Sequence, residues 1–144
     1  MFKNRGNKAT RDKDSILANV KNLLLILTPA IQAMPKIERI EGAPREMKLA
    51  CCNMIRYYSI AKEATEVRLE NIHKMIGEFG VLLAAFEICI TTGLLTEKTS
   101  LAIAEQLERI EEGVKKWRNA ARSIKSQDCR EVGDMQESDG STIK

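Results

Sequence analysis

Residues 69–90 read LENIHKMIGEFGVLLAAFEICI, and this stretch decides the fold. Its apolar residues recur in alternating steps of three and four, which is the pattern of a helix with one side buried against other helices. The stripe consists of Leu69, Ile72, Ile76, Phe79, Leu83, Phe86 and Ile90. In the second half the intervening positions are apolar too, so the helix needs cover on all sides. One small bundle rarely gives that much cover, and the pattern therefore indicates oligomerisation.

Three further stripes with the same spacing lie on either side of this helix. The first, in a helix predicted from Asp14 or Ser15 onward, is Ile16, Val20, Leu23, Leu27, Ile31 and Met34. The second, in a helix that begins near Pro44, is Met47, Cys51, Met54, Tyr58 and Ala61. The last is Ile103, Leu107, Ile110, Val114, Trp117, Ala121 and Ile124. The joins at 35–42, 64–66 and 93–95 are short, so the chain is predicted to be all-α, an up-down-up-down four-helix bundle.

Capping and breaking residues set the predicted boundaries. Pro29 lies inside the first apolar run and lacks an N–H group, so we expect a kink or a break there. Residues 36–42 are predicted to form a short linker. Thr65 and Thr96 are the candidate N-caps of the third and fourth helices, and Gly93 is the candidate residue that ends the third helix.

Positive charge is concentrated at the two ends of the predicted bundle. Residues 1–13 hold five bases and one acid, and residues 113–126 hold five bases and no acid. Residues 14–112 and 127–144 each carry a net charge of −3. We predict a disordered basic arm at 1–13, the bundle at 14–126 and a disordered acidic tail at 127–144. The basic ends indicate an anionic partner, or they only complement helix dipoles.

The end of the fourth helix combines a close helix crossing with a basic face. Gly113 in mid-helix and Trp117 one turn later predict that a neighbouring helix approaches closely here. Basic residues three and four positions apart line one side of the same helix, as a phosphate backbone requires. They are Lys115, Arg118, Arg122 and Lys125.

Catalytic signatures are weak. The string Glu70-x-x-His73 matches half of a di-metal bundle motif, but it occurs once, and the stripe turns it toward solvent. With a single histidine and no nucleophile or phosphate-loop motif, we predict a non-enzyme without metal or cofactor. The four cysteines form no C-x-x-C pair, and residues 1–13 lack the apolar core of a signal peptide. The continuous apolar runs are too short to span a membrane. These features predict a cytoplasmic protein with reduced thiols.

Several short segments are similar to a known family. They are the run Leu27-Thr-Pro-Ala-Ile-Gln-Ala-Met-Pro35, the run Pro44-Arg-Glu-Met47, the Ala61-Lys62 region that opens a long helix and the Gly-x-x-x-Trp motif, and the resemblance covers residues 16–124. Together they resemble the small bacterial four-helix-bundle family. It includes proteins encoded within ribosomal RNA intervening sequences and the accessory variability (Avd) proteins of diversity-generating retroelements. The first two runs look closer to the Avd proteins, while residues 37–42 and the acidic tail depart from the pattern.

The resemblance implies a homopentameric barrel with a basic surface. Such a protein binds the reverse transcriptase and structured template RNA of its element and supports mutagenic reverse transcription, without catalysis of its own. The alternative is a protein–protein adaptor that does not contact nucleic acid. The predicted interface residues are Arg45, Lys48, Arg56, Lys62, Arg68, Lys115, Lys116, Arg118 and Arg122.

Overall fold

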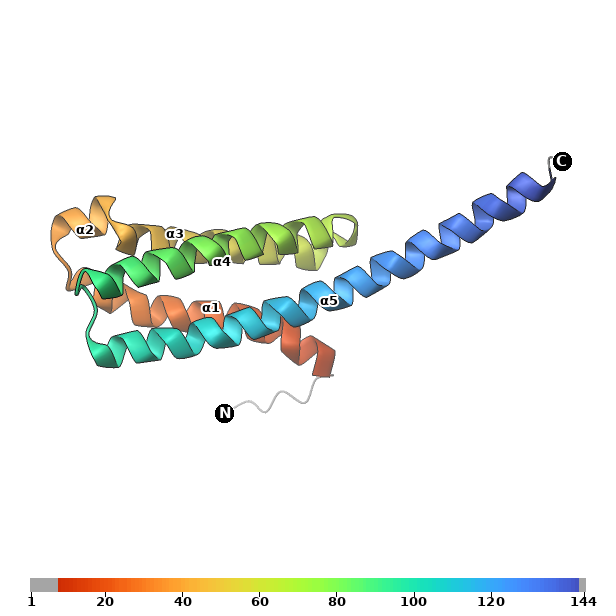
Figure 1. Ribbon diagram of the computed structural model, residues 1–144. Helices are drawn as coiled ribbons and strands as arrows, with labels where there is room; N and C mark the ends of the chain where they lie inside the picture. Colours follow the sequence, from red (N-terminus) through yellow and green to blue (C-terminus); the bar gives the residue numbers. More distant parts are fainter. Residues whose placement is uncertain (1–7, 143–144) are drawn as a thin grey trace.

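The computed structural model describes residues 8–142, and the side chains of residues 15–127. The elements are α1 (Lys8–Gln32), α2 (Lys36–Glu41), α3 (Ala43–Glu63), the 3₁₀ helix η1 (Thr65–Val67), α4 (Arg68–Thr91) and α5 (Glu97–Thr142). The four long helices α1, α3, α4 and α5 run alternately in opposite directions as a four-helix bundle, with α2 across one end (Figure 1). The predicted fold class is thus confirmed for the single chain.

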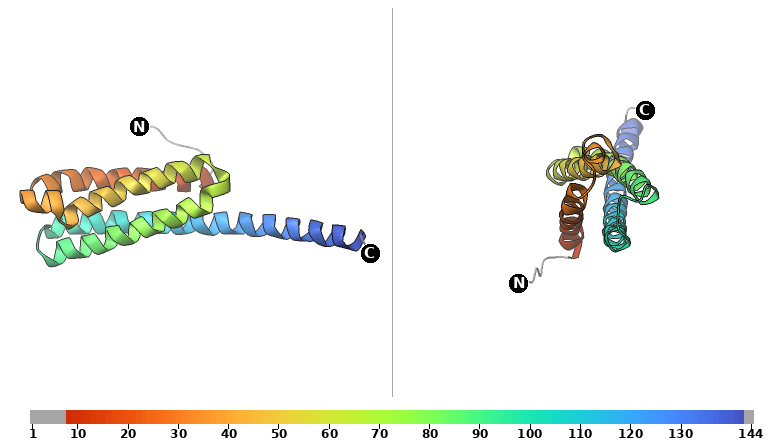
Figure 2. Two further views of the ribbon diagram at one scale, coloured as in Figure 1. Left: turned by 90° about the horizontal axis from the view of Figure 1, so that it is seen from above. Right: turned by 90° about the vertical axis from the view of Figure 1, so that its left-hand side faces the viewer.

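The core lies between two closely packed helix pairs. Helix α3 packs most extensively on α4, and α1 packs on α5, while α1–α3 and α4–α5 are the looser neighbours. The view along the bundle in Figure 2 shows the four helices around this core. The stripes predicted for the first, second and fourth helices are buried, except that Ile124 at the end of the last stripe is 57 % exposed. Periodicity therefore identified three of the four buried sides.

The buried side of α4 differs in part from the prediction. Ile72, Phe79 and Phe86 are buried as expected. Met75, Leu82 and Cys89 are also buried, although they were not predicted. The predicted residues Leu69, Ile76 and Leu83 are partly buried and pack against the core, whereas Ile90 is 48 % exposed. The spacing alone could not distinguish the predicted residues from those that are buried. Either group, combined with Ile72, Phe79 and Phe86, gives the same alternation of three and four.

The turn between α4 and α5 forms as predicted. Gly93 has φ of 71°, in the left-handed region that favours glycine. Its N–H donates to the Ile90 carbonyl at 3.1 Å, and the Leu94 N–H donates to the Cys89 carbonyl at 3.0 Å. This is the hydrogen-bond pattern of a Schellman motif. The Thr99 N–H donates to Thr96 Oγ1 at 3.2 Å, so Thr96 caps α5.

Other predicted boundaries were wrong. Residues 36–42 are not simply a linker, because Lys36–Glu41 form α2 directly after Pro35, which has the extended backbone of an N-cap residue. Thr65 lies in η1 and does not cap α4, whose first turn has no side-chain cap. Helix α1 continues through Pro29 without a break. Proline removes one backbone hydrogen bond and crowds the carbonyl four residues earlier, but Leu27 and Ile31 on either side of Pro29 are buried in the core and hold the helix in place.

Both ends of the bundle also differ from the expected domain limits. Helix α1 begins at Lys8, inside the predicted arm, so Ser15 is not its N-cap. Helix α5 continues to Thr142 and projects beyond the bundle, away from α2 (Figures 1 and 2). Neither stretch contains a proline to stop the helix. Residues 1–7 and 143–144 of the predicted arm and tail lie outside the described residues.

Helix α1 contains one stretch with the length and composition of a membrane-spanning helix. Ser15–Gln32 is long enough and apolar enough, by composition, to cross a membrane, although its continuous apolar run is short. The buried residues of this stretch, among them Leu23 and Leu27, lie in the bundle core. Core helices of soluble proteins meet the same criterion.

Candidate nucleic-acid interface

The predicted cations on α3 are exposed along its outer side. Arg45 and Lys48 lie near α2, and Arg56 follows two turns later. Arg45 and Lys48 line a groove between α1, α2 and α3, together with Arg39 of α2. The prediction omitted Arg39, because it had placed that residue in a linker with no defined side. Helix formation by residues 36–41 brings this third cation to the groove.

Two predicted cations lie at the opposite end of α3. Lys62 is exposed in the last turn. Arg68 is half-buried and turns back onto α3: its Nε donates to the Ala61 carbonyl at 2.7 Å, and its Nη2 donates to the Lys62 carbonyl at 3.2 Å. The last carbonyls of a helix have no partner within the helix, and a guanidinium there also complements the helix dipole. Arg68 therefore stabilises the α3–η1 corner, which spacing in the sequence could not show.

The first two cations of the α5 cluster are exposed and paired within the helix. Lys115 Nζ lies 2.5 Å from Glu111 Oε1, and Lys116 Nζ lies 3.1 Å from Glu112 Oε1. Exposed pairs four residues apart contribute only about 0.3–0.5 kcal/mol, so an anionic ligand can displace these partners at small cost.

Arg118 lies in the shallow groove where α4 and α5 are loosely packed. The groove has a volume of about 230 Å³, and its walls include Phe79, Gly80 and Val114. Among the described residues, no hydrogen-bond acceptor pairs with the buried Nε atom of Arg118. An unpaired buried donor is costly, and an acceptor from a partner can reach this atom only after the side chain moves outward.

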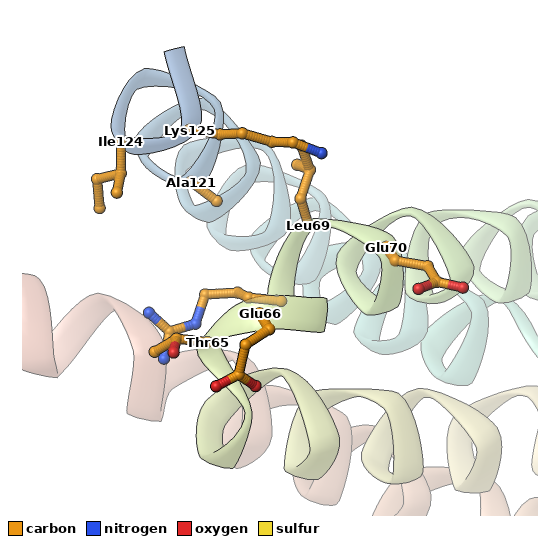
Figure 3. A pocket seen from close by; sticks show the side chains of 8 residues that line it. Thr65, Glu66, Leu69, Glu70, Ala121, Ile124 and Lys125 are labelled. Carbon is orange, nitrogen blue, oxygen red and sulfur yellow. The ribbon is translucent and has the colours of Figure 1, made fainter. Parts of the chain in front are cut away.

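Arg122 and Lys125 continue the basic stripe to the end of the bundle. Arg122 Nη2 lies 3.5 Å from His73 Nε2 of α4. Lys125 and Ile124 reach over η1 and the start of α4, where they line a cavity of about 450 Å³ (Figure 3). Glu66 and Glu70 line the same cavity. The stripe predicted from spacing thus follows the α4–α5 seam, but carboxylates accompany it at this end.

The nine predicted residues therefore do not form one surface. Arg45 and Lys48 lie at the α2 end, the α5 cations follow the seam with α4 toward the other end, and Arg56 lies between the ends of α3. A set of cations along a helix seam can hold a phosphate backbone, and it carries no base specificity by itself.

The described residues give no metal centre. Among them, no group of three or more His, Cys, Asp or Glu side chains lies close enough together to hold a metal ion. Glu70 and His73 are exposed, and Glu70 pairs with Lys74 at 3.7 Å. Comparison of the chain with protein-family models, with curated proteins and with solved structures found no match.

Proposed function

We propose that this protein is a non-catalytic accessory subunit of a diversity-generating retroelement, as its resemblance to the Avd proteins implies. It binds the reverse transcriptase and structured template RNA and supports mutagenic reverse transcription. It acts as a homo-oligomer, a pentameric barrel. Eight of the nine predicted cations serve as the binding surface, and Arg68 holds the α3–η1 corner.

The observation that supports this proposal best is the basic stripe along the α4–α5 seam. Residues 113–126 carry five bases and no acid. Lys115, Arg118 and Lys125 line the shallow depressions along that seam. A continuous basic face on an otherwise acidic bundle favours a polyanionic ligand over an adaptor that contacts only protein.

The test compares two triple charge reversals. The interface variant replaces Lys115, Lys116 and Arg122 by Glu, and the control variant replaces Lys21, Lys36 and Lys98 by Glu. All six side chains are exposed, and both variants change the net charge equally. The probes are a single-stranded RNA and an RNA hairpin, with binding followed by fluorescence anisotropy at several salt concentrations, and circular dichroism checks the fold.

We expect the interface variant to lose at least about tenfold in RNA affinity, with a shallower salt dependence, because each phosphate contact contributes about 0.7 to the slope on single strands. The control variant should lose clearly less. Equal losses in the two variants would show that only net charge matters, and unchanged affinity in the interface variant at low salt would remove these residues from the interface.

A further inference from the structure

The groove at the α2 end combines an apolar floor with a basic rim. Its volume is about 530 Å³. The lining residues are Ile31, Gln32, Arg39, Ile40, Arg45, Lys48, Leu49 and Cys52. Three of these are cations, and none is an acid. Glu38, Glu41 and Glu46 belong to the same elements but do not line the groove. A ligand that fits it must therefore offer apolar groups and negative charge together.

Helix α2 exposes the apolar side chains beside this groove. The helix has no buried residue, and Ile37 and Ile40 are 67 % and 51 % exposed. Leu49 of α3 adds a further exposed apolar side chain. A six-residue helix is too short to be stable by itself. Exposed apolar side chains gathered in one place mark an interaction site.

The cations of this groove differ from those on α5 in their partners. Arg39, Arg45 and Lys48 form no ion pair within the part of the chain whose side chains are described. Lys115 and Lys116, in contrast, are paired with glutamates, and Glu66 and Glu70 line the same cavity as Lys125. An acidic ligand therefore meets less repulsion at the α2 end than along α5.

The chain contains one segment with the required chemistry. Residues 128–142 carry five acids and one base, a net charge of −4. Acids recur every third residue at 128, 131, 134 and 137, beside the apolar or thiol residues Cys129, Val132 and Met135. Positions three apart are neighbours on a helix surface. In Figures 1 and 2 this part of α5 projects alone beyond the bundle.

We propose that residues 128–142 of one copy dock in the groove between α1, α2 and α3 of a second copy. The acidic segment complements Arg39, Arg45 and Lys48, and its apolar residues cover the floor of the groove. A second copy is required because α5 carries the segment away from its own α2 (Figure 1). The contact is head-to-tail. It shares Arg45 and Lys48 with the binding surface proposed above, and its test therefore measures a disulfide between copies rather than RNA affinity.

The chain provides its own reporter for this contact. Cys52 is exposed and lines the groove, and Cys129 lies in the acidic segment. Docking brings the two thiols of different copies together. Mild oxidation by copper–phenanthroline, which accepts the two electrons, then joins them as a disulfide with release of two protons. We expect a covalent dimer on a non-reducing gel, with a Cys52–Cys129 peptide pair identified by mass spectrometry.

Variants of the full-length chain decide whether the groove causes this reaction. The double variant Arg45→Glu and Lys48→Glu should form the disulfide about tenfold more slowly, since it turns two favourable charge contacts into repulsive ones. The matched control is Arg56→Glu with Lys98→Glu, which changes the net charge equally at two exposed cations that do not line the groove, and it should retain the rate. Cys52→Ser should abolish the pair.

Three results would overturn the proposal. The first is a Cys52–Cys129 disulfide found only within monomers, because it would place the segment in the groove of its own chain. The second is a rate that the double variant does not change. The third is a double variant that loses RNA affinity while its disulfide forms normally, which would assign the groove to nucleic acid. Loss of RNA binding in the α5 variant alone leaves this proposal unaffected.

Discussion

Cys51 and Cys52 are adjacent on α3 but differ in their exposure to solvent. Cys51 is buried, and burial together with the neighbouring Cys52 raises the pKa of its thiol to about 12. Cys89 is buried in α4, where burial and the nearby Glu38 carboxylate raise the pKa of its thiol to about 11. Cys52 is exposed. The reactive thiolate form is thus suppressed in the core at neutral pH.

This difference predicts the pattern of alkylation. At pH 8, iodoacetamide should label Cys52 rapidly and leave Cys51 and Cys89 unlabelled, because their raised pKa values keep them protonated and burial excludes the reagent. Labelling of the two core thiols should remain slow until the pH approaches those pKa values. Peptide mass spectrometry measures each site, with urea-unfolded protein as the control in which all sites react. Rapid native labelling of Cys51 would contradict the burial described here.

At the same scale, the sequence identifies the cations but not their partners. Spacing correctly placed Lys115, Arg118 and Arg122 along one helix side. It could not show that Arg68 would turn back to the carbonyls of α3, since that contact depends on the η1 corner. It also omitted Arg39, whose position depends on α2.

At the scale of the helices, apolar spacing predicts a buried side only when the opposite side is polar. Helix α3 has a polar outer side, and all five of its predicted core residues are buried. Helix α4 is apolar nearly all round, and its spacing placed Ile76 on the buried stripe. In the structure Met75 is fully buried, and Ile76 is partly buried against the core. The short helix α2 was missed because six residues give no periodicity.

Gly113 was predicted to mark a close helix crossing, and the structure shows the contact. A Cβ atom added at Gly113 would lie 3.0 Å from Ile16 Cγ1 of α1, whereas one added at Gly77 meets nothing within 4 Å. Gly113→Val should lower the free energy of unfolding by about 1–3 kcal/mol, the usual cost of overpacking. Gly80→Val, where an added Cβ also meets nothing within 4 Å and which lies outside the proposed barrel contact, should change it little, or raise it slightly through helix propensity.

Urea unfolding at a fixed protein concentration measures both variants. In an Ile16→Ala background, Gly113→Val should lower the free energy of unfolding by less than it does in the native chain, because alanine at position 16 makes room for valine. If Gly113→Val proved as stable as the native chain, the α1–α5 crossing would be looser than described.

For the whole molecule, the bundle leaves the outer side of α4 uncovered. Gly77, Val81, Ala84 and Ile88 lie on this side in steps of four and three, and all four are exposed. This is the apolar excess that predicted oligomerisation from the sequence. Within a single chain, the other helices cover the core side of α4 but leave its outer side exposed. In the proposed pentameric barrel, a neighbouring copy would cover this outer side.

Static light scattering of nuclease-treated protein tests this last point. We expect five times the chain mass for the native protein at concentrations too low for docking of residues 128–142 to join barrels, and multiples of that mass above them. The double variant Val81→Glu and Ile88→Glu should dissociate toward monomers, because burying two unpaired carboxylates in an interface is strongly unfavourable. The control, Leu25→Glu and Leu101→Glu, adds the same charge at exposed apolar positions on α1 and α5 and should keep the native mass. A native monomer would contradict the barrel, and with it the homo-oligomeric part of the proposed function. Dissociation of both double variants would instead show that added charge, rather than the α4 side, controls assembly.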